Sequence, residues 1–185
     1  MKEKFKYFTD EDTPTLEEVL DNRERRIGKI RELEDRFPDK TIFCFKLNIP
    51  GAQKINDAVV KIFAYGVSEI SKILSMASVL FKEEKIIKTG PELFLVTDYD
   101  TFLLKEKMVE LEESSAFGRL YDVDLVKNGE NITREMLNYE PRKCFICEND
   151  AKVCARNRAH SVDEMILRIE NLIEDNKEDL WQIEK

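Results

Sequence analysis

The order of hydrophobic patterns between residues 41 and 126 restricts the fold more than any other feature of the sequence. β-Branched and aromatic runs predict strands, whereas apolar residues at helical spacing predict helices. In chain order these segments are a strand at 41–49, a helix from 55 to about 81, strands at 84–88 and 92–97, a helix from 100 to about 113 and a strand at 120–126. This order is that of a ferredoxin-like βαββαβ unit, in which helices cover one face of an antiparallel sheet. We therefore expect an α+β fold with a mixed or antiparallel sheet covered by helices.

Further helices flank this unit on both sides. Thr15 with Glu18, and Ser161 with Glu164, have the spacing of a capping box, which starts a helix. The first predicts a helix at 15–35, and the second a helical C-terminal segment; a short helix is also expected from Thr133. The first ten or so residues suggest a poorly fixed lead-in. We expect one domain over residues 1–185, with its core at about 15–126 and a Cys- and Arg-rich segment with the last helix at about 127–178.

Composition indicates a globular protein outside the membrane. Apolar residues make up 42% of the chain and charged residues 37%, which is typical of a folded domain. No apolar run approaches the ~20 residues that a membrane-spanning helix needs. The amino end lacks the apolar core of a signal peptide. A cytoplasmic location, with no membrane partner, is the expectation.

Charge is distributed unevenly along the chain. The formal net charge of −8 argues against non-specific nucleic-acid binding, which requires a basic surface. Between residues 142 and 160 the balance reverses, with five cations against Glu148 and Asp150. These cations are Arg142, Lys143, Lys152, Arg156 and Arg158. Such a basic segment on an acidic protein predicts a place that holds phosphates or an acidic partner.

Asp122 and Asp124 are the first candidate catalytic residues. Side chains alternate between the two faces of a strand, so both carboxylates lie on the same face. Two carboxylates so placed can share Mg²⁺, a cation that prefers oxygen ligands together with substrate phosphates. A half-exposed strand with two solvated aspartates is the other interpretation. Gly118 and Arg119 strengthen the first, because a glycine lets the backbone approach a phosphate and an arginine can clamp one.

Three cysteines and the only histidine of the chain follow closely on one another. Cys144, Cys147, Cys154 and His160 would complete a Cys3His zinc set, and the first pair has the spacing of a zinc knuckle. The remaining intervals match no familiar zinc module. Cys154 also fits a buried helical position, where cysteine acts as a small apolar side chain. Zinc binding and packing therefore both stay open, with a disulfide as the least favoured reading.

Arg156 and Arg158 lead into the start of the last helix. A helix N-terminus carries free N–H groups and positive partial charge, so the arginines beside it would form a cradle for a di- or triphosphate. A solvated basic loop is the alternative. His160 is a candidate general base, or a donor to a phosphate, although a lone histidine often has a structural role.

Two blocks of this sequence resemble the CitX family. They are GRLYDVDLV at 118–126 and PRKCFICENDAKVCARNRAH at 141–160. The family pattern runs Gly-Arg-Leu-x-Asp-x-Asp, Arg-x-Cys-x-x-Cys, Cys-Ala-Arg and then His, and this chain keeps all of it. The likeness extends to the amino half, at 23–26, at Pro50-Gly51 before Lys54, and at Ile62-Phe63 before Gly66. The members are citrate lyase holo-acyl-carrier-protein synthases, also called apo-citrate lyase phosphoribosyl-dephospho-CoA transferases.

The resemblance implies a specific reaction of the nucleotidyltransferase type. Such enzymes transfer the 2'-(5''-phosphoribosyl)-3'-dephospho-CoA group from its triphosphate precursor, triphosphoribosyl-dephospho-CoA. The acceptor is a serine of the acyl carrier protein (gamma) subunit of citrate lyase, and diphosphate leaves. The resemblance implies that Asp122 and Asp124 hold Mg²⁺ against the triphosphate, with His160 as a candidate base. The residues expected to contact the phosphates are Gly118, Lys54, Arg119, Arg142, Arg156 and Arg158.

One departure from related chemistry keeps alternatives open. Nucleotidyltransferases with a two-aspartate site usually carry Gly-Ser before it and a third carboxylate later, whereas Gly118-Arg119 stands here. Glu130 and Glu135 are close only in sequence. A non-enzymatic Cys3His zinc module that binds nucleotide or protein is one alternative. A nucleotidyltransferase with a different acceptor is the other.

Overall fold

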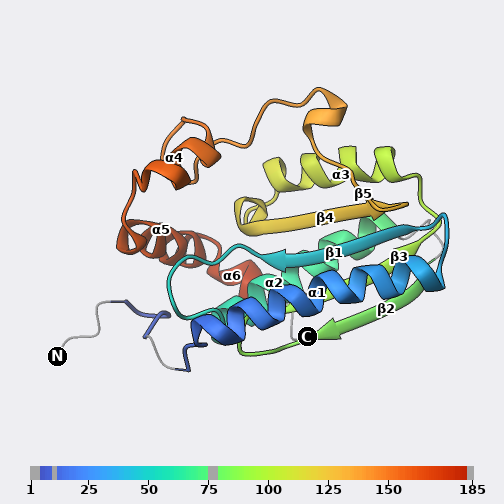
Figure 1. Ribbon diagram of the computed structural model, residues 1–185. Coiled ribbons are helices and arrows are strands. Elements are labelled where there is room, and N and C mark those ends of the chain that lie inside the picture. Colours follow the sequence, from blue (N-terminus) through green and yellow to red (C-terminus); the bar gives the residue numbers. More distant parts are fainter. Residues whose placement is uncertain (1–4, 10–11, 75–78, 183–185) are drawn as a thin grey trace.

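The computed structural model describes residues 5–9, 12–74 and 79–182 (Figure 1). Its helices are α1 (Leu16–Arg36), α2 (Asp57–Ile73), α3 (Thr101–Ser114), α4 (Ala151–Asn157), α5 (Val162–Asp175) and α6 (Lys177–Trp181). Its strands are β1 (Thr41–Leu47), β2 (Val79–Lys85), β3 (Glu92–Thr97), β4 (Tyr121–Lys127) and β5 (Glu130–Asn131). Two short 3-10 helices are η2 (Gly118–Leu120) and η3 (Glu135–Leu137).

The strands form one sheet in the order β2-β3-β1-β4-β5. All of its neighbouring strands are antiparallel. Without the short β5, the order from the other edge is 4-1-3-2, which is the arrangement of a ferredoxin-like unit. The predicted α+β class and strand order are therefore confirmed.

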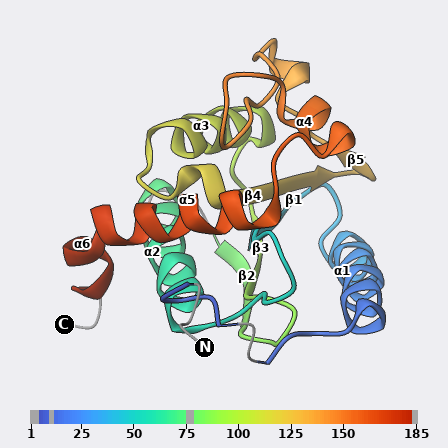
Figure 2. The ribbon, with the colours of Figure 1, turned by 90° about the vertical axis from the view of Figure 1, so that its left-hand side faces the viewer.

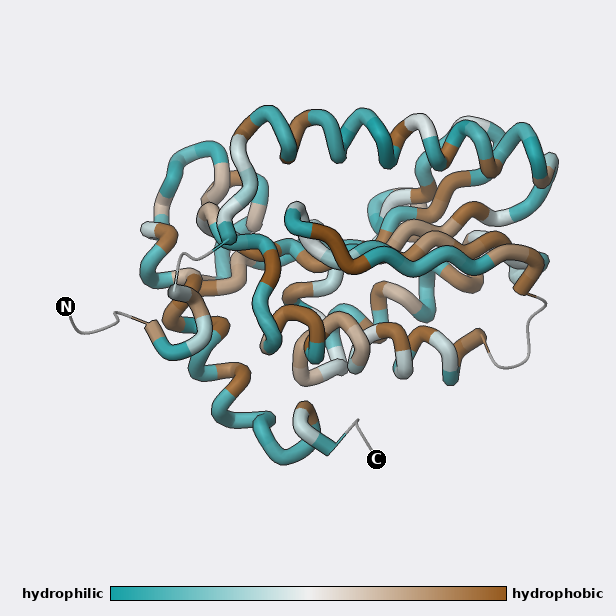
Figure 3. The backbone as a smooth tube through the Cα atoms, turned by 90° about the horizontal axis from the view of Figure 1, so that it is seen from below, coloured by the Kyte–Doolittle hydropathy of each residue, from teal (hydrophilic) through white to brown (hydrophobic). Residues whose placement is uncertain are grey.

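Helices cover both faces of this sheet (Figure 2). On one face, Phe43 and Phe45 of β1 join the large core that α2, α3 and α5 complete. On the other, Ile42 and Cys44 pack with Leu33 of α1 in a smaller core. Figure 3 shows hydrophobic residues concentrated in the strands, whereas α1 is mostly hydrophilic. The expectation of helices on one face was thus incomplete, because the central strands bury both of their faces.

Most element boundaries agree with expectation, and those of three elements do not. The predicted helix from 55 to 81 ends at Ile73, and residues 79–81 belong to β2, which extends to Lys85 rather than Lys88. Residues 75–78, also assigned to that helix, lie outside the described part of the chain. The error has a physical reason, since a short apolar run fits either a strand or a buried helical turn. The helix expected from Thr133 is only the 3-10 turn η3.

Within the expected lead-in, the described residues 5–9 contact the rest of the fold. Phe8 is 4% exposed and belongs to the large core. The backbone N–H of Tyr7 donates to Oε1 of Glu170 on α5 at 2.7 Å, which ties this described part of the lead-in to the last long helix. Both predicted capping boxes, at Thr15 and Ser161, are confirmed. Among the residues that the structure describes, no helix is long and apolar enough to cross a membrane.

Candidate functional site

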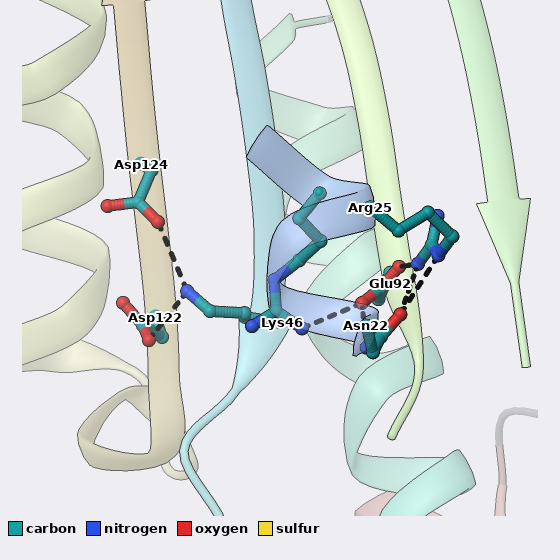
Figure 4. A network of polar contacts seen from close by, with 7 residues as sticks. Asn22, Arg25, Lys46, Glu92, Asp122 and Asp124 are labelled. Carbon is teal, nitrogen blue, oxygen red and sulfur yellow. Dashed lines mark hydrogen bonds and ion pairs between the residues drawn. The ribbon is translucent and has the colours of Figure 1, made fainter. Parts of the chain in front are cut away.

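Lys46 of β1 lies between the two candidate carboxylates of β4 (Figure 4). The register of the β1–β4 pair places Lys46 opposite Asp122, and Cys44 opposite Asp124. The Lys46 ammonium is 2.7 Å from Oδ2 of Asp122 and 3.1 Å from Oδ2 of Asp124. In this structure the two carboxylates share the ammonium group of Lys46, and their binding of Mg²⁺ stays a prediction.

The charges of this trio are only partly balanced. The side chain of Lys46 is 20% exposed, whereas those of Asp122 and Asp124 are 42% and 38% exposed. Burial opposes the charge of Lys46, but the two carboxylates outweigh it and raise the lysine pKa. One ammonium against two carboxylates leaves one negative charge on the solvent side of β4. This excess negative charge favours a further cation at the same place.

A second cluster of charged side chains lies next to Lys46, Asp122 and Asp124 on the same face of the sheet, toward α1; these side chains together are called the carboxylate row. Glu92 of β3 lies opposite Lys46 in the β1–β3 pair, on the same face, and its side chain is only 2% exposed. Its Oε1 accepts from Nδ2 of Asn22 at 2.7 Å and from Arg26 at 2.9 Å, while Arg25 pairs with its Oε2. A buried carboxylate needs such partners. The cluster therefore fixes α1 above the carboxylate row.

One cavity, of about 160 Å³, opens on the α1 side of the row and is named here the α1-side cavity. Asp122, Lys46 and Arg26 line it together with Lys54. Lys54 is held by a hydrogen bond from its Nζ to the Ile49 carbonyl at 2.6 Å, and burial lowers its pKa. The structure therefore brings the predicted phosphate contact Lys54 into one cavity with Asp122.

A second cavity, of about 320 Å³, opens toward α3 and is named here the α3-side cavity. Asp122 and Asp124 line it together with the predicted residue Arg142. Arg142 donates to the Tyr121 carbonyl at 2.8 Å and pairs with Glu112 of α3 at 2.8 Å. Arg142 therefore lies against the strand that carries the two aspartates.

Two cations that sequence reasoning did not select complete the α3-side cavity. Arg134 pairs with Glu112 at 3.4 Å, and the buried Lys105 donates to the Val123 carbonyl at 3.0 Å. Burial lowers the pKa of Lys105, against the raising effect of Glu112 and Asp124. Burial also raises the pKa of Glu112, which the three neighbouring cations partly offset. Arg134, Arg142 and Lys105 thus all interact with one buried carboxylate, that of Glu112.

Gly118 and Arg119 have structural contacts of their own. Gly118 is buried in η2, and an added Cβ would lie 2.6 Å from the carbonyl oxygens of both Leu111 and Glu112. Because the backbone lies this close to α3, packing alone requires glycine at position 118, whether or not a substrate binds there. Arg119 donates to the Lys143 carbonyl, and burial followed by the nearby Arg142 lowers its pKa. Arg119 therefore joins η2 to the Cys-rich segment.

The Cys-rich segment brings its four candidate ligands together. One ligand atom from each of Cys144, Cys147, Cys154 and His160 lies within 4.8 Å of all the others. All three sulfurs are free thiols. Burial opposes ionisation of Cys144, but backbone N–H groups of Cys147 and Ile146 outweigh it and lower the pKa to about 7. The four groups thus form one cluster rather than separate packing positions.

A third cavity, of about 650 Å³, adjoins this cluster and is named here the cysteine-side cavity. His160 and Arg158 line it, together with apolar residues such as Phe145 and Met165. Asn48 lines both this cavity and the α1-side cavity, so the two are neighbours. His160 and Arg158 are not among the residues that line either cavity around Asp122.

The start of α5 is occupied by its own capping box. The Ser161 hydroxyl accepts from the Glu164 backbone, and the Ser161 N–H donates to the Glu164 carboxylate at 2.8 Å. A carboxylate therefore already lies at the place proposed for phosphate. Arg156 is exposed near the end of α4, and Arg158, which adopts a left-handed backbone conformation (φ 48°), caps that helix.

A third carboxylate near the aspartates comes from Glu135. It lines the α3-side cavity with both of them, and its carboxylate pairs with Lys152 at 3.1 Å. Hydrogen bonds, led by its own backbone N–H, lower its pKa to about 2. Glu130 is exposed on β5. Glu135 was expected to be close to the aspartates only in sequence, but it lines the same cavity as both of them.

The central residues that sequence reasoning missed are Lys46 and Glu92. Lys46 left a signal, because it is the only charged residue in the apolar run from Thr41 to Leu47. A lysine in such a strand requires a partner on the neighbouring strand. Glu92 is buried and is bound by Arg25 and Arg26 of α1.

Comparisons with known proteins agree with one another. A family model described as apo-citrate lyase phosphoribosyl-dephospho-CoA transferase matches residues 14–176. The probable apo-citrate lyase phosphoribosyl-dephospho-CoA transferase of Streptococcus pyogenes serotype M3 is 34% identical over 162 residues, covering 85% of this chain and 84% of that protein. A protein of the same name from Vibrio cholerae serotype O1 is 32% identical over 169 residues, covering 87% and 92%. Protein CitXG of Leuconostoc mesenteroides subsp. cremoris is 34% identical over 177 residues, but this chain spans only 36% of its length.

Proposed function

Because this chain belongs to the family of apo-citrate lyase phosphoribosyl-dephospho-CoA transferases, we propose that it transfers a phosphoribosyl-dephospho-CoA group to apo-citrate lyase. The donor in this proposal is the triphosphate form of the group, and the acceptor is a serine of the acyl carrier subunit. A bond forms between the serine oxygen and the innermost phosphorus of the donor, while the bond from that phosphorus to diphosphate breaks. Family membership does not favour the alternative of a non-enzymatic binding module.

The observation that carries this proposal is that Asp122 lines two cavities, each of which is also lined by lysine or arginine side chains. Lys46 and Lys54 lie on the α1 side, and Lys105, Arg134 and Arg142 lie on the α3 side. A triphosphate carries several negative charges, and more charge develops on the diphosphate as it leaves. Cations fixed in advance by hydrogen bonds stabilise this charge at little cost of rearrangement. The arrangement supports phosphoryl-group transfer of the nucleotidyltransferase type.

Asp122 and Asp124 are the residues proposed to hold Mg²⁺. Their donor set fits this ion, because Mg²⁺ prefers oxygen ligands and the two carboxylates carry one charge more than the Lys46 ammonium between them. When bound, the ion would neutralise charge on the phosphate oxygens. Lys46 would then be released in part from the carboxylates, and its ammonium could contact a phosphate.

The cysteine-side cavity is proposed to accept the remaining part of the donor. It has apolar walls, a volume of about 650 Å³ and a common wall residue, Asn48, with the α1-side cavity. A nucleotide with a long pantetheine arm needs such space next to its phosphate site. Arg158 at this cavity, with the exposed Arg156, remains a candidate contact for the donor's other phosphates or for an acidic carrier protein.

The experiment that tests this function measures transfer directly. The protein is incubated with Mg²⁺, the triphosphoribosyl-dephospho-CoA precursor and the apo acyl carrier subunit, and the carrier is then weighed by mass spectrometry. We expect a mass increase of one prosthetic group and release of one diphosphate per carrier. A carrier whose acceptor serine is replaced by alanine is the control and should gain no mass. An unchanged mass of the native carrier with folded enzyme would contradict the proposal.

A further inference from the structure

The cluster of Cys144, Cys147, Cys154 and His160 has the dimensions of an assembled metal site. Sγ of Cys147 is 3.6 Å from Sγ of Cys154 and 3.3 Å from Nε2 of His160. A tetrahedral zinc ion with Zn–S bonds of about 2.3 Å and a Zn–N bond of about 2.0 Å places its ligand atoms roughly 3.5–3.8 Å apart. Both measured edges agree with this geometry to within a few tenths of an ångström. All other separations in the cluster are at most 4.8 Å, so closing onto one ion requires a shift of about 1 Å.

The local backbone supports thiolate ligands at this place. The N–H of Ile146 points to Sγ of Cys144 at 3.4 Å, and Nδ2 of Asn149 approaches Sγ of Cys147 at 3.6 Å. The Cys144 N–H donates to the Asn149 carbonyl at 2.6 Å, which closes the loop that carries the first two cysteines. Donors around a ligand sulfur stabilise its negative charge, as the outer contacts of a metal site do. The loop therefore presents both sulfurs in a fixed position.

Cys44 provides an internal contrast to this cluster. It is 2% exposed among apolar side chains of the smaller core, as expected for a cysteine that only packs. Cys144, Cys147 and His160 are instead partly exposed and point to one centre, to which α4 adds Cys154. Simple packing does not require three thiols and an imidazole around a single point.

We propose that these four side chains bind one zinc ion, in a site that nothing in the transfer reaction requires. Three sulfurs and one nitrogen are the donor set of zinc rather than of Mg²⁺, which takes oxygen. Four protein ligands leave no open position for a substrate, so the site is structural rather than catalytic. This role replaces the candidate role of His160 as general base, because its Nε2 is directed at the ion.

The zinc site would stabilise the segment that carries Arg142 and that accepts a hydrogen bond from Arg119. Arg142 precedes the first ligand by two residues and contacts both Tyr121 and Glu112. The neighbouring Lys143 carbonyl accepts from Arg119. Short loops with little regular structure gain much of their order from a bound metal. The ion thus holds residues 142–160 against β4 and α5 without taking part in the chemistry.

The test is the metal content of the full-length protein. The zinc content of protein purified under reducing conditions is measured by inductively coupled plasma mass spectrometry, and we expect about one zinc per chain. Cys147→Ala should reduce this to less than a tenth, while Cys44→Ala, the matched control, should keep it. Wild-type protein that is folded and reduced but contains no zinc after incubation with Zn²⁺ would overturn the proposal. Equal loss from both variants would do the same.

Two further measurements keep the test independent of how well a variant folds. Replacing the zinc of the wild type by Co²⁺ should give the intense visible bands of a tetrahedral cobalt–thiolate centre. Removing zinc with a chelator should raise amide hydrogen exchange in residues 142–160 at least tenfold and leave β1 and β3 unchanged. An octahedral cobalt spectrum, or exchange that does not change on chelation, would contradict the site.

Discussion

The ammonium of Lys46 lies 2.7 Å from the carboxylate of Asp122, because β1 and β4 place these two residues directly opposite each other. This relationship links the fold to the proposed chemistry. The candidate metal site faces a lysine that already neutralises half of its charge. A divalent cation that binds there must compete with Lys46, and the displaced ammonium is then available to a phosphate.

The first prediction concerns this competition. Lys46→Met leaves Asp122 and Asp124 side by side without a cation, so the free energy of unfolding should fall by about 1 kcal/mol in buffer without Mg²⁺. Millimolar Mg²⁺ should restore more stability to this variant than to the wild type. Urea unfolding with and without Mg²⁺ measures both effects. Lys82→Met, at a lysine side chain that is 51% exposed on β2, is the control and should show neither. Equal effects of Mg²⁺ on Lys46→Met and wild type would argue against a metal at the two aspartates.

A second prediction concerns the buried carboxylate under α1. Glu92→Gln removes the charge that Arg25 and Arg26 share, so the free energy of unfolding should fall by about 3 kcal/mol. Glu84→Gln, at a side chain that is 39% exposed on β2, should change it by less than about 0.5 kcal/mol. Chemical denaturation separates the two variants. Similar small losses in both would show that the cluster does not fix α1.

A third prediction separates packing from phosphate binding at Gly118. Gly118→Ala places a methyl group 2.6 Å from two carbonyl oxygens of α3 and should cost about 1–3 kcal/mol of stability. Gly28→Ala in α1 meets no atom within 4 Å and should stabilise the protein by up to about 1 kcal/mol. Thermal unfolding of both variants provides the comparison. A fully stable Gly118→Ala variant that has lost activity would instead support a direct role at the substrate.

A fourth prediction concerns alkaline pH. Burial raises the pKa of the Cys44 thiol from 9.0 to about 12. Above pH 9 the unfolded chain loses this proton while the folded chain keeps it, so stability must fall as pH rises between these two values. The wild type should lose about 1 kcal/mol per pH unit more than Cys44→Ala in this range. Parallel pH profiles of the two proteins would contradict a buried, neutral thiol.

Local sequence signals predicted much of this fold. The capping boxes at Thr15 and Ser161 and the strand at 92–97 all depend on residues close together in the chain. Such signals determine where an element begins and ends. The end of α2 was missed because the apolar residues at 79–81 continue the helical pattern although they form an edge strand. Over only three residues, neither the hydrophobic periodicity nor the composition distinguishes a helix from a strand.

The site was predictable only where its residues lie close together in the sequence. The aspartate pair on one face of β4 follows from alternation alone, and the cysteine cluster lies within seventeen residues. The contact of Lys46 with Asp124 joins residues 78 positions apart and depends on the register of two strands. Register arises from packing of the whole sheet, so a single sequence does not reveal it. The functional grouping of Lys54, Arg142 and Glu135 around Asp122 has the same origin.

The most direct measurement of the central claim is the transfer rate of Asp122→Asn and Asp124→Asn, with Asp98→Asn as the control. Asp98 is a carboxylate of similar exposure, 43%, that pairs with Lys40 away from the site. We predict that both site variants fold normally and lose at least about a hundredfold in kcat, because the charge that holds the cation is removed. Asp98→Asn should remain within about twofold of the wild type. Transfer at an undiminished rate by folded Asp122→Asn and Asp124→Asn would contradict this account of the site.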